Sequence, residues 1–197
     1  MAIEIFLVIP QDPANPPIAE DAQPDPTVSA AFPNATAIPV NSFALGLSNP
    51  VEYSGASAGA GAGKVSLSSL SITKYMDKAS PSLFSACTSG SHFSTAQLYI
   101  RQSGGPGSGG PGAGAPGAGG TGPSTFLAYE FQMVFVAAIE WGGSAGSTVP
   151  TESVSLSYGR VVVAYKQQGA AGSAGPVTQG GWDQITNTSD VQSTLAV

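Results

Sequence analysis

Cys87 and His92 are the only thiol and imidazole in the chain, and they are the side chains best suited to nucleophilic chemistry. A Cys–His pair reacts as a nucleophile and base when the histidine holds the thiol as a thiolate. Cys87, however, falls on the apolar stripe of an expected short helix, and His92 follows the residue that ends it. We therefore interpret Cys87 as a structural thiol. One Cys and one His also fall short of a zinc ligand set, so no metal or other cofactor is predicted.

Two further patterns suggest chemistry and fail on detail. Glu130 and Glu140 share one parity of an expected strand, but they lie too far apart along it to act together as a carboxylate pair. The run Gly59–Lys64 is similar to a phosphate-binding loop, yet Ala58 and Val65 stand where that loop needs Gly and Ser or Thr. The run also precedes a strand, so no helix N-terminus would face a phosphate. We predict that the chain is not an enzyme.

The composition is weakly charged and rich in small residues. Charged residues make up 9% of the 197, whereas about 25% is usual for a soluble domain. A weakly charged surface is typical of a subunit that its neighbours cover. Compositional drift towards Ala, Gly and Pro would explain the low charge equally well, since the chain has 26 Gly and 16 Pro. The net charge is −6 and the six basic residues are scattered, so no nucleic-acid partner is expected.

The elements that must position these residues are mostly strands. Residues 129–140 alternate, with Tyr129, Phe131, Met133, Phe135 and Ile139 on one expected face. At Gly159–Arg160 the apolar phase slips by one residue, as it does at a β-bulge, and such slips curl a sheet into a barrel. The other expected strands are Ile3–Ile9, Ala37–Leu47, the run around Leu70–Ile72, and Thr95–Arg101.

One short helix is expected after Ala79. Ser80 suits the N-cap, Pro81 the first helical position, and Gly90 the left-handed residue that ends a helix. Its buried stripe, which we take as the helix core, is predicted to consist of Leu83, Phe84 and Cys87.

The chain is predicted to form a single domain over residues 1–185, followed by a flexible C-terminal tail, 186–197. Three segments break the strand pattern and are predicted to be surface loops. They are a Pro- and acid-rich loop, 10–35, an extended loop with a Gly/Ala run, 47–64, and a Gly/Pro-rich insert, 103–124. No apolar run is long enough to insert into a membrane, and the opening residues are expected to form a strand and not a signal peptide.

The centre of the chain resembles the haemolysin-coregulated protein (Hcp) family, the tube proteins of type VI secretion systems. The resemblance rests on the order of motifs: a Thr-Lys-Tyr strand end at 73–75, a capped helix, Ala-Cys-Thr-Ser-Gly at 86–90, and Ala-Gln-Leu-Tyr-Ile-Arg at 96–101. It continues through 151–156, 161–165 and Gly181-Trp182, and so covers most of the chain. The Pro-rich loop and the Gly/Pro-rich insert are longer than the family pattern leads us to expect.

The resemblance implies a mostly β fold, a curled two-sheet β-barrel with one short flanking helix, assembling into a ring. It implies a homohexamer whose rings stack into a tube, made in the cytoplasm and secreted through the type VI system with its other components. It also implies effector proteins as cargo in the lumen. In the family, a long loop at the position of 47–64 mediates stacking. The candidate stacking residues are Val51, Glu52, Tyr53, Ser54, Gly55, Gly63 and Lys64.

Two alternatives stay open beside the structural tube subunit. One is a free ring that serves mainly as a carrier or adaptor for an effector, and the other is a related phage tail-tube protein. A secreted β-sandwich lectin is disfavoured because no leader is recognised at the N-terminus.

Overall fold

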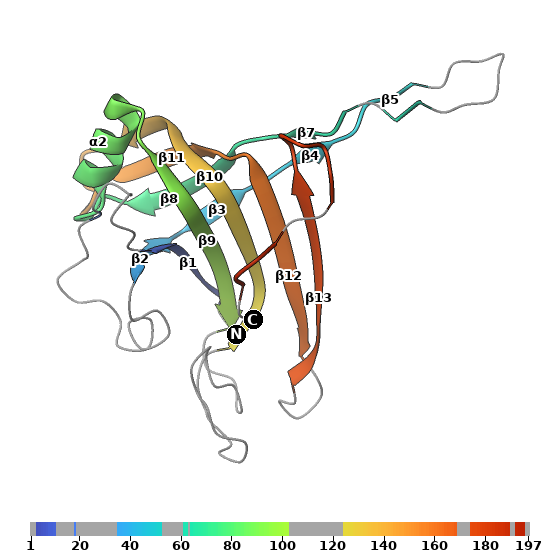
Figure 1. The fold of residues 1–197 in the computed structure, drawn as a ribbon. Coiled ribbons are helices and arrows are strands. Elements are labelled where there is room, and N and C mark those ends of the chain that lie inside the picture. Colours follow the sequence, from blue (N-terminus) through green and yellow to red (C-terminus); the bar gives the residue numbers. More distant parts are fainter. Residues whose placement is uncertain are drawn as a thin grey trace.

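The computed structural model describes residues 3–10, 18, 35–52, 61–62, 64–102, 124–168, 174–189 and 192–195, and these are mostly β, with one helix among them (Figure 1). This confirms the predicted fold class. The elements are β1 (Ile3–Pro10), β2 (Ala35–Val40), β3 (Ser42–Ala44), β4 (Leu47–Ser48), β5 (Val51–Glu52), β6 (Gly61–Ala62), β7 (Ser66–Leu67), β8 (Leu70–Tyr75), α2 (Ser80–Ser89), β9 (His92–Gln102), β10 (Ser124–Gly142), β11 (Thr151–Ser157), β12 (Arg160–Gln168) and β13 (Ala174–Asp183).

Nine of these strands form one antiparallel sheet. Its order is β2-β1-β9-β10-β11-β8-β3, and β12 branches from β10 and pairs with β13. The predicted two-sheet barrel is wrong in this respect, because the sheet's end strands, β2 and β3, do not pair with each other. Only Asn41 separates these two strands in the chain, and its N–H donates to the Thr73 carbonyl at 2.8 Å. The backbone itself therefore turns the corner between the two ends of the sheet.

Strands β9 and β10, and the chain at the break between β11 and β12, change the face that they turn to the core at one level of the sheet. Met133 lies at this level with a left-handed φ of 56°, and the Gly159 N–H donates to the Gln132 carbonyl at 3.0 Å. The predicted slip at Gly159–Arg160 is found here as the break between β11 and β12, which both pair with β10. The buried residues on either side of the change are Phe93 and Ala96 in β9, Phe131 and Val134 in β10, and Tyr158 and Val161 around the β11–β12 break.

The predicted continuous alternation over residues 129–140 is therefore wrong at Met133 and Phe135, whereas Ile139, which follows a register shift between Val136 and Ala138, packs against the core as predicted. Met133 and Phe135 are 42% and 39% exposed, while Val134 and Val136 are buried in their place. A left-handed residue reverses the side-chain parity of a strand, and no sequence periodicity marks such a residue when it is not glycine.

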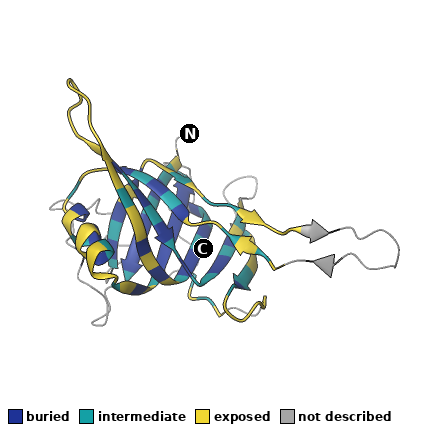
Figure 2. Cartoon of the chain, turned by 90° about the horizontal axis from the view of Figure 1, so that it is seen from above, coloured by how far each residue is buried: buried dark blue, intermediate teal, exposed yellow. Residues whose placement is uncertain are grey.

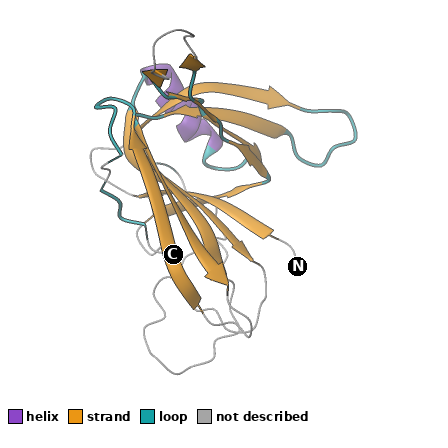
Figure 3. Ribbon diagram, turned by 90° about the vertical axis from the view of Figure 1, so that its right-hand side faces the viewer, coloured by secondary structure: helices purple, strands orange, loops and turns teal. Residues whose placement is uncertain are grey.

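Helix α2 lies at one end of the strands (Figure 3) and buries Ser80, Leu83 and Ala86. Of the predicted helix core, Leu83 is fully buried and Cys87 is partly buried against the core, but Phe84 is 47% exposed. The prediction for Phe84 is wrong because the buried stripe is narrow and this residue lies at its flank. The helix ends at Gly90 with φ 67°, as predicted.

The start of α2 differs from the predicted N-cap. Ser80 is the first helical residue, and the preceding Ala79 already has helical angles and makes no side-chain cap. The Asp77 carboxylate instead accepts the Ala79 N–H at 2.9 Å, an Asx-type turn that leads into the helix.

The predicted extended loop 47–64 is, over its described residues, a two-stranded ribbon that leaves the body of the protein (Figures 1 and 2). We call this ribbon, formed by the pairs β4–β7 and β5–β6, the arm. Gly46 and Ser68 clasp its base, since the Ser68 hydroxyl donates to the Gly46 carbonyl at 3.0 Å and accepts the Gly46 N–H at 2.8 Å.

The other predicted loops lie largely outside the described residues, which include only residues 10, 18 and 35 of the first loop and residue 124 of the insert. The predicted flexible tail, 186–197, is described at 186–189 and 192–195. Thr188 pairs with Asp183, and Thr194 bonds to Glu130 on the sheet, so these residues contact the body of the protein, and the flexibility of the tail stays a prediction. Among the described residues, no helix has the length and hydropathy of a membrane span.

Candidate functional site

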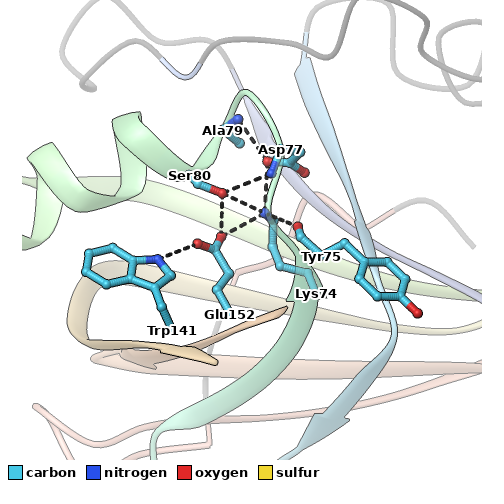
Figure 4. A network of polar contacts seen from close by, with 7 residues as sticks. All are labelled: Lys74, Tyr75, Asp77, Ala79, Ser80, Trp141 and Glu152. Atoms are coloured by element: carbon cyan, nitrogen blue, oxygen red, sulfur yellow. Dashed lines mark hydrogen bonds and ion pairs between the residues drawn. The ribbon is translucent and has the colours of Figure 1, made fainter. Parts of the chain in front are cut away.

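A buried ionic network fixes α2 to the sheet (Figure 4). Lys74, at the end of β8, is fully buried, and its Nζ lies 2.7 Å from Glu152 Oε1 and 2.8 Å from Asp77 Oδ1. The same ammonium donates to the Tyr75 carbonyl at 2.9 Å and to the Ser80 hydroxyl at 3.2 Å. A buried charge is tolerated when it is paired and hydrogen bonded in this way.

Glu152 is the other centre of the network. Its Oε1 accepts the Ser80 hydroxyl at 2.9 Å, and its Oε2 accepts the Trp141 indole N–H at 3.0 Å. The two charges thus link β8, β10 and β11 to the first turn of α2. The described donors and acceptors are directed at one another, so the network holds the helix in place and is not a reaction centre.

The sequence itself carries a signal for this pair. Lys74 continues the inward parity of Leu70 and Ile72, and Glu152 continues that of Val154 and Leu156. A lysine and a glutamate that end the buried faces of two strands indicate a buried ion pair.

Cys87, interpreted as a structural thiol, lies on α2, and His92 begins β9. Cys87 packs against the core, and the His92 ring lies 5.3 Å from the Phe135 ring. Glu130 is buried and Glu140 is exposed. In the described part of the chain, no group of three or more His, Cys, Asp or Glu side chains is placed to hold a metal ion.

The candidate stacking residues are only partly described. The backbone of Val51 and Glu52 forms β5, where these residues pair with Ala62 and Gly61, and Lys64 is exposed on the returning chain. Tyr53, Ser54, Gly55 and Gly63 lie outside the described residues. The stacking contact therefore stays a prediction.

Two further exposed features suit contacts with other chains. Strand β13 is ten residues long and pairs only with β12 among the described strands, so it forms an edge of the sheet. Phe84 and Trp141 form an exposed aromatic pair at the helix end, with ring centroids 5.8 Å apart and exposures of 47% and 52%.

A long antiparallel sheet that carries one helix, α2, among the described residues and extends a ribbon from its body defines a class of β-rich protein seen in solved structures. A structure described as a type six secretion system protein has a TM-score of 0.70 and 27% identity, over 96% of this chain and 100% of that one. Hcp1 from Salmonella typhimurium has a TM-score of 0.64 and 28% identity, over 96% of this chain and 100% of its own.

Comparison of sequences agrees with the fold. Protein hcp1 of Pseudomonas aeruginosa is 36% identical over 119 residues, which are 59% of this chain and 64% of that relative, less than two thirds of its length. Residues 32–165 match the family described as type VI secretion system effector, Hcp. The chain belongs to the Hcp family of type VI secretion systems, and the predicted family is thus confirmed.

Proposed function

We propose that this protein is a structural subunit of the tube of a type VI secretion apparatus, forming hexameric rings that stack and are secreted through the system. Membership of the Hcp family supports a role in a type VI secretion system. Likeness to a solved type six secretion system protein supports a subunit of the same fold. Its principal partner is then a second copy of itself, with other components of the system beside it.

The arm is the observation that carries the stacking role. A two-stranded ribbon is marginally stable on its own, so a ribbon that leaves the body is best explained by a partner surface. Leu47 on the arm is 61% exposed, and the segment between β5 and β6 consists of Gly, Ala and Ser apart from Tyr53. Small side chains allow close backbone approach, which suits a repeated contact between copies.

Ring closure is supported by the open edge of β13 and by the weakly charged composition. A contact between two different surfaces of the same chain is heterologous, and such contacts generate either a closed ring or a filament. The 9% of charged residues leaves large surfaces that a neighbour covers without burying unpaired charge.

Shortening the arm tests the proposal. In the test variant, an Asn-Gly turn replaces residues 49–65, which joins the paired Ser48 and Ser66 and keeps the β4–β7 pair at the base. We expect rings of about six times the monomer mass in sedimentation and mass photometry, but no tubes in electron micrographs. The matched control shortens the exposed β10–β11 connection, 143–150, and should form tubes as the wild type does.

Two results would count against the proposal. Tubes that form equally well without the arm would end its stacking role. A wild-type chain that stays monomeric at all accessible concentrations would refute the proposed ring. Secretion is tested separately, by whether the protein reaches the culture medium only when the secretion apparatus is intact.

A second candidate function is favoured by the description of the matching family, which is called an effector. In that case the ring travels free and carries an effector protein in its lumen. Stable single rings that retain an effector through purification, and that do not stack as concentration rises, would support the carrier over the tube subunit.

A further inference from the structure

A buried carboxylate lies on the face of the sheet that is turned away from the main core. Glu130 of β10 is 1% exposed and shares this face with a small apolar cluster of Val8, Tyr99 and Ala128. Its Oε1 accepts the Gln132 side-chain amide at 2.9 Å, and its Oε2 accepts the Gln97 amide at 3.0 Å. The strand framework therefore supplies part, but not all, of the hydrogen bonding of this charge.

The remaining bonds come from a segment that crosses the sheet near the C-terminus (Figure 1). We call residues 192–195, which follow β13, the strap. The Thr194 hydroxyl donates to Glu130 Oε2 at 2.6 Å, and the Thr194 N–H donates to the same oxygen at 3.0 Å. The Gln132 amide also donates to the Gln192 carbonyl at 2.9 Å, and Leu195 packs against the apolar cluster.

The sheet thus contacts three features of the strap: the backbone carbonyl of Gln192, the hydroxyl and backbone N–H of Thr194, and the aliphatic side chain of Leu195. The groups that make these contacts come from β9 and β10 at the centre of the sheet, so they are held rigidly. Gln97 is also oriented by its bond from the Tyr99 hydroxyl at 3.1 Å. A charged acceptor that receives two donors from one residue distinguishes threonine from an apolar residue of the same shape.

The strap is held by side chains and not by a strand ladder, since its described residues pair with no strand. Its release would break a few hydrogen bonds and uncover Leu195, the small apolar cluster beneath it and the Glu130 carboxylate, and it would leave every ladder of the sheet intact. The Glu130 carboxylate would keep the bonds from Gln97 and Gln132. These are the properties of an occupied binding site, in contrast to those of a strand within the fold.

We propose that the face around Glu130 is a peptide-binding site for an extended segment in which threonine precedes an aliphatic residue. The strap occupies it within the chain, and a segment of the same chemistry from outside exchanges with the strap. This inference concerns a surface separate from the arm and does not depend on the tube function.

The test uses a chain that ends after Ser189, which keeps the bridge between Asp183 and Thr188. The probe is a fluorescent peptide with the sequence of residues 190–197, and binding is followed by anisotropy. We expect saturable binding by this chain and weaker apparent binding by the full chain, where the strap competes as an intramolecular ligand. A peptide with Thr194→Val should bind at least about tenfold more weakly, because it loses a hydrogen bond to a charged group.

In the shortened chain, Glu130→Gln should weaken binding of the wild-type peptide to a similar extent. Glu140→Gln should leave the binding unchanged, because Glu140 is an exposed carboxylate on the same strand. If shortening unfolds the protein, the full chain with Thr194→Val and Leu195→Ser replaces it, since its strap no longer competes. Absence of saturable binding by a folded variant overturns the proposal, as does equal binding of the Thr194→Val peptide. Unfolding of both variants overturns it too, because the strap would then be part of the folded core.

Discussion

Replacing Lys74 by methionine tests whether the buried network holds the helix to the sheet. The substitution keeps the length and apolar stem of the side chain but leaves the fully buried Glu152 carboxylate without its cation. Breaking a buried pair from one side costs about 3–5 kcal/mol, a large part of the roughly 5–15 kcal/mol that stabilises a typical domain. For a chain of this size, that loss corresponds to a fall in melting temperature of about 6–20 °C.

The double variant Lys74→Met, Glu152→Gln separates an uncompensated charge from lost packing. The glutamine carries no charge: its single carbonyl oxygen can accept the Trp141 N–H, and its amide group can donate to the Ser80 hydroxyl oxygen. We expect the double variant to recover at least half of the stability lost by Lys74→Met, because removing both members of a buried pair is often nearly neutral. Non-additivity of this kind is the direct measure of coupling between the two residues.

Urea unfolding followed by circular dichroism measures both effects as changes in the midpoint at a constant slope. It should be run at several protein concentrations, because self-association would make the midpoint depend on concentration. Lys78→Met is the matched control, since Lys78 is exposed and should change stability by less than about 0.5 kcal/mol. The reasoning fails if Lys74→Met is no more destabilised than Lys78→Met, or if the double variant loses the sum of the two single losses.

Three further outcomes are expected. Burial raises the pKa of Asp183, but hydrogen bonds from the turn that follows it and from Arg160 outweigh burial and lower the pKa from an ordinary 3.8 to about 2. The stability that the ionised carboxylate contributes is therefore present above pH 3.8 and is lost as the pH falls towards 2. Acid titration of unfolding should show this loss in the wild type and not in Asp183→Asn. Gly175→Ala should destabilise by about 1–3 kcal/mol, since its Cβ would lie 2.7 Å from a carbonyl oxygen of β12, whereas Gly159→Ala meets only the end of a flexible side chain and should cost less in the same urea assay. Cys87→Ala should lower stability by about 1 kcal/mol or less, because the thiol is only partly buried, and a larger loss would show tighter packing than the structure gives.

Much of the fold follows from local signals in the sequence. Alternation of apolar residues predicted the main strands, and Pro81 with Gly90 placed the only described helix within a residue of its ends. The slip at Gly159–Arg160 correctly marked the break between β11 and β12, because a change in the phase of apolar residues is visible in the sequence itself.

The features that were missed depend on contacts distant in sequence or on single backbone angles. No periodicity announces the left-handed Met133, and so Phe135 was assigned to the wrong face. The network around Lys74 and the strap on Glu130 join residues far apart in the chain, and their pairing becomes evident only when the strands are in register. Polar residues that accept local bonds are easily taken for solvated ones when their distant partners are unknown.

The pairing of β1 bears on how the chain folds as it is synthesised. This strand lies between β2 and β9, so its second ladder cannot form until residue 102 has been made. Strand β8 can pair early with β3, but its ladder with β11 has to wait until residues 151–156 have been made. The central β9–β10 ladder likewise has to wait for the residues beyond the Gly/Pro-rich insert. Closing a long loop costs little more free energy than closing a short one, but non-local pairing slows the search for the native state. We therefore expect the nascent chain to reach its native sheet late, after most of the polypeptide has left the ribosome.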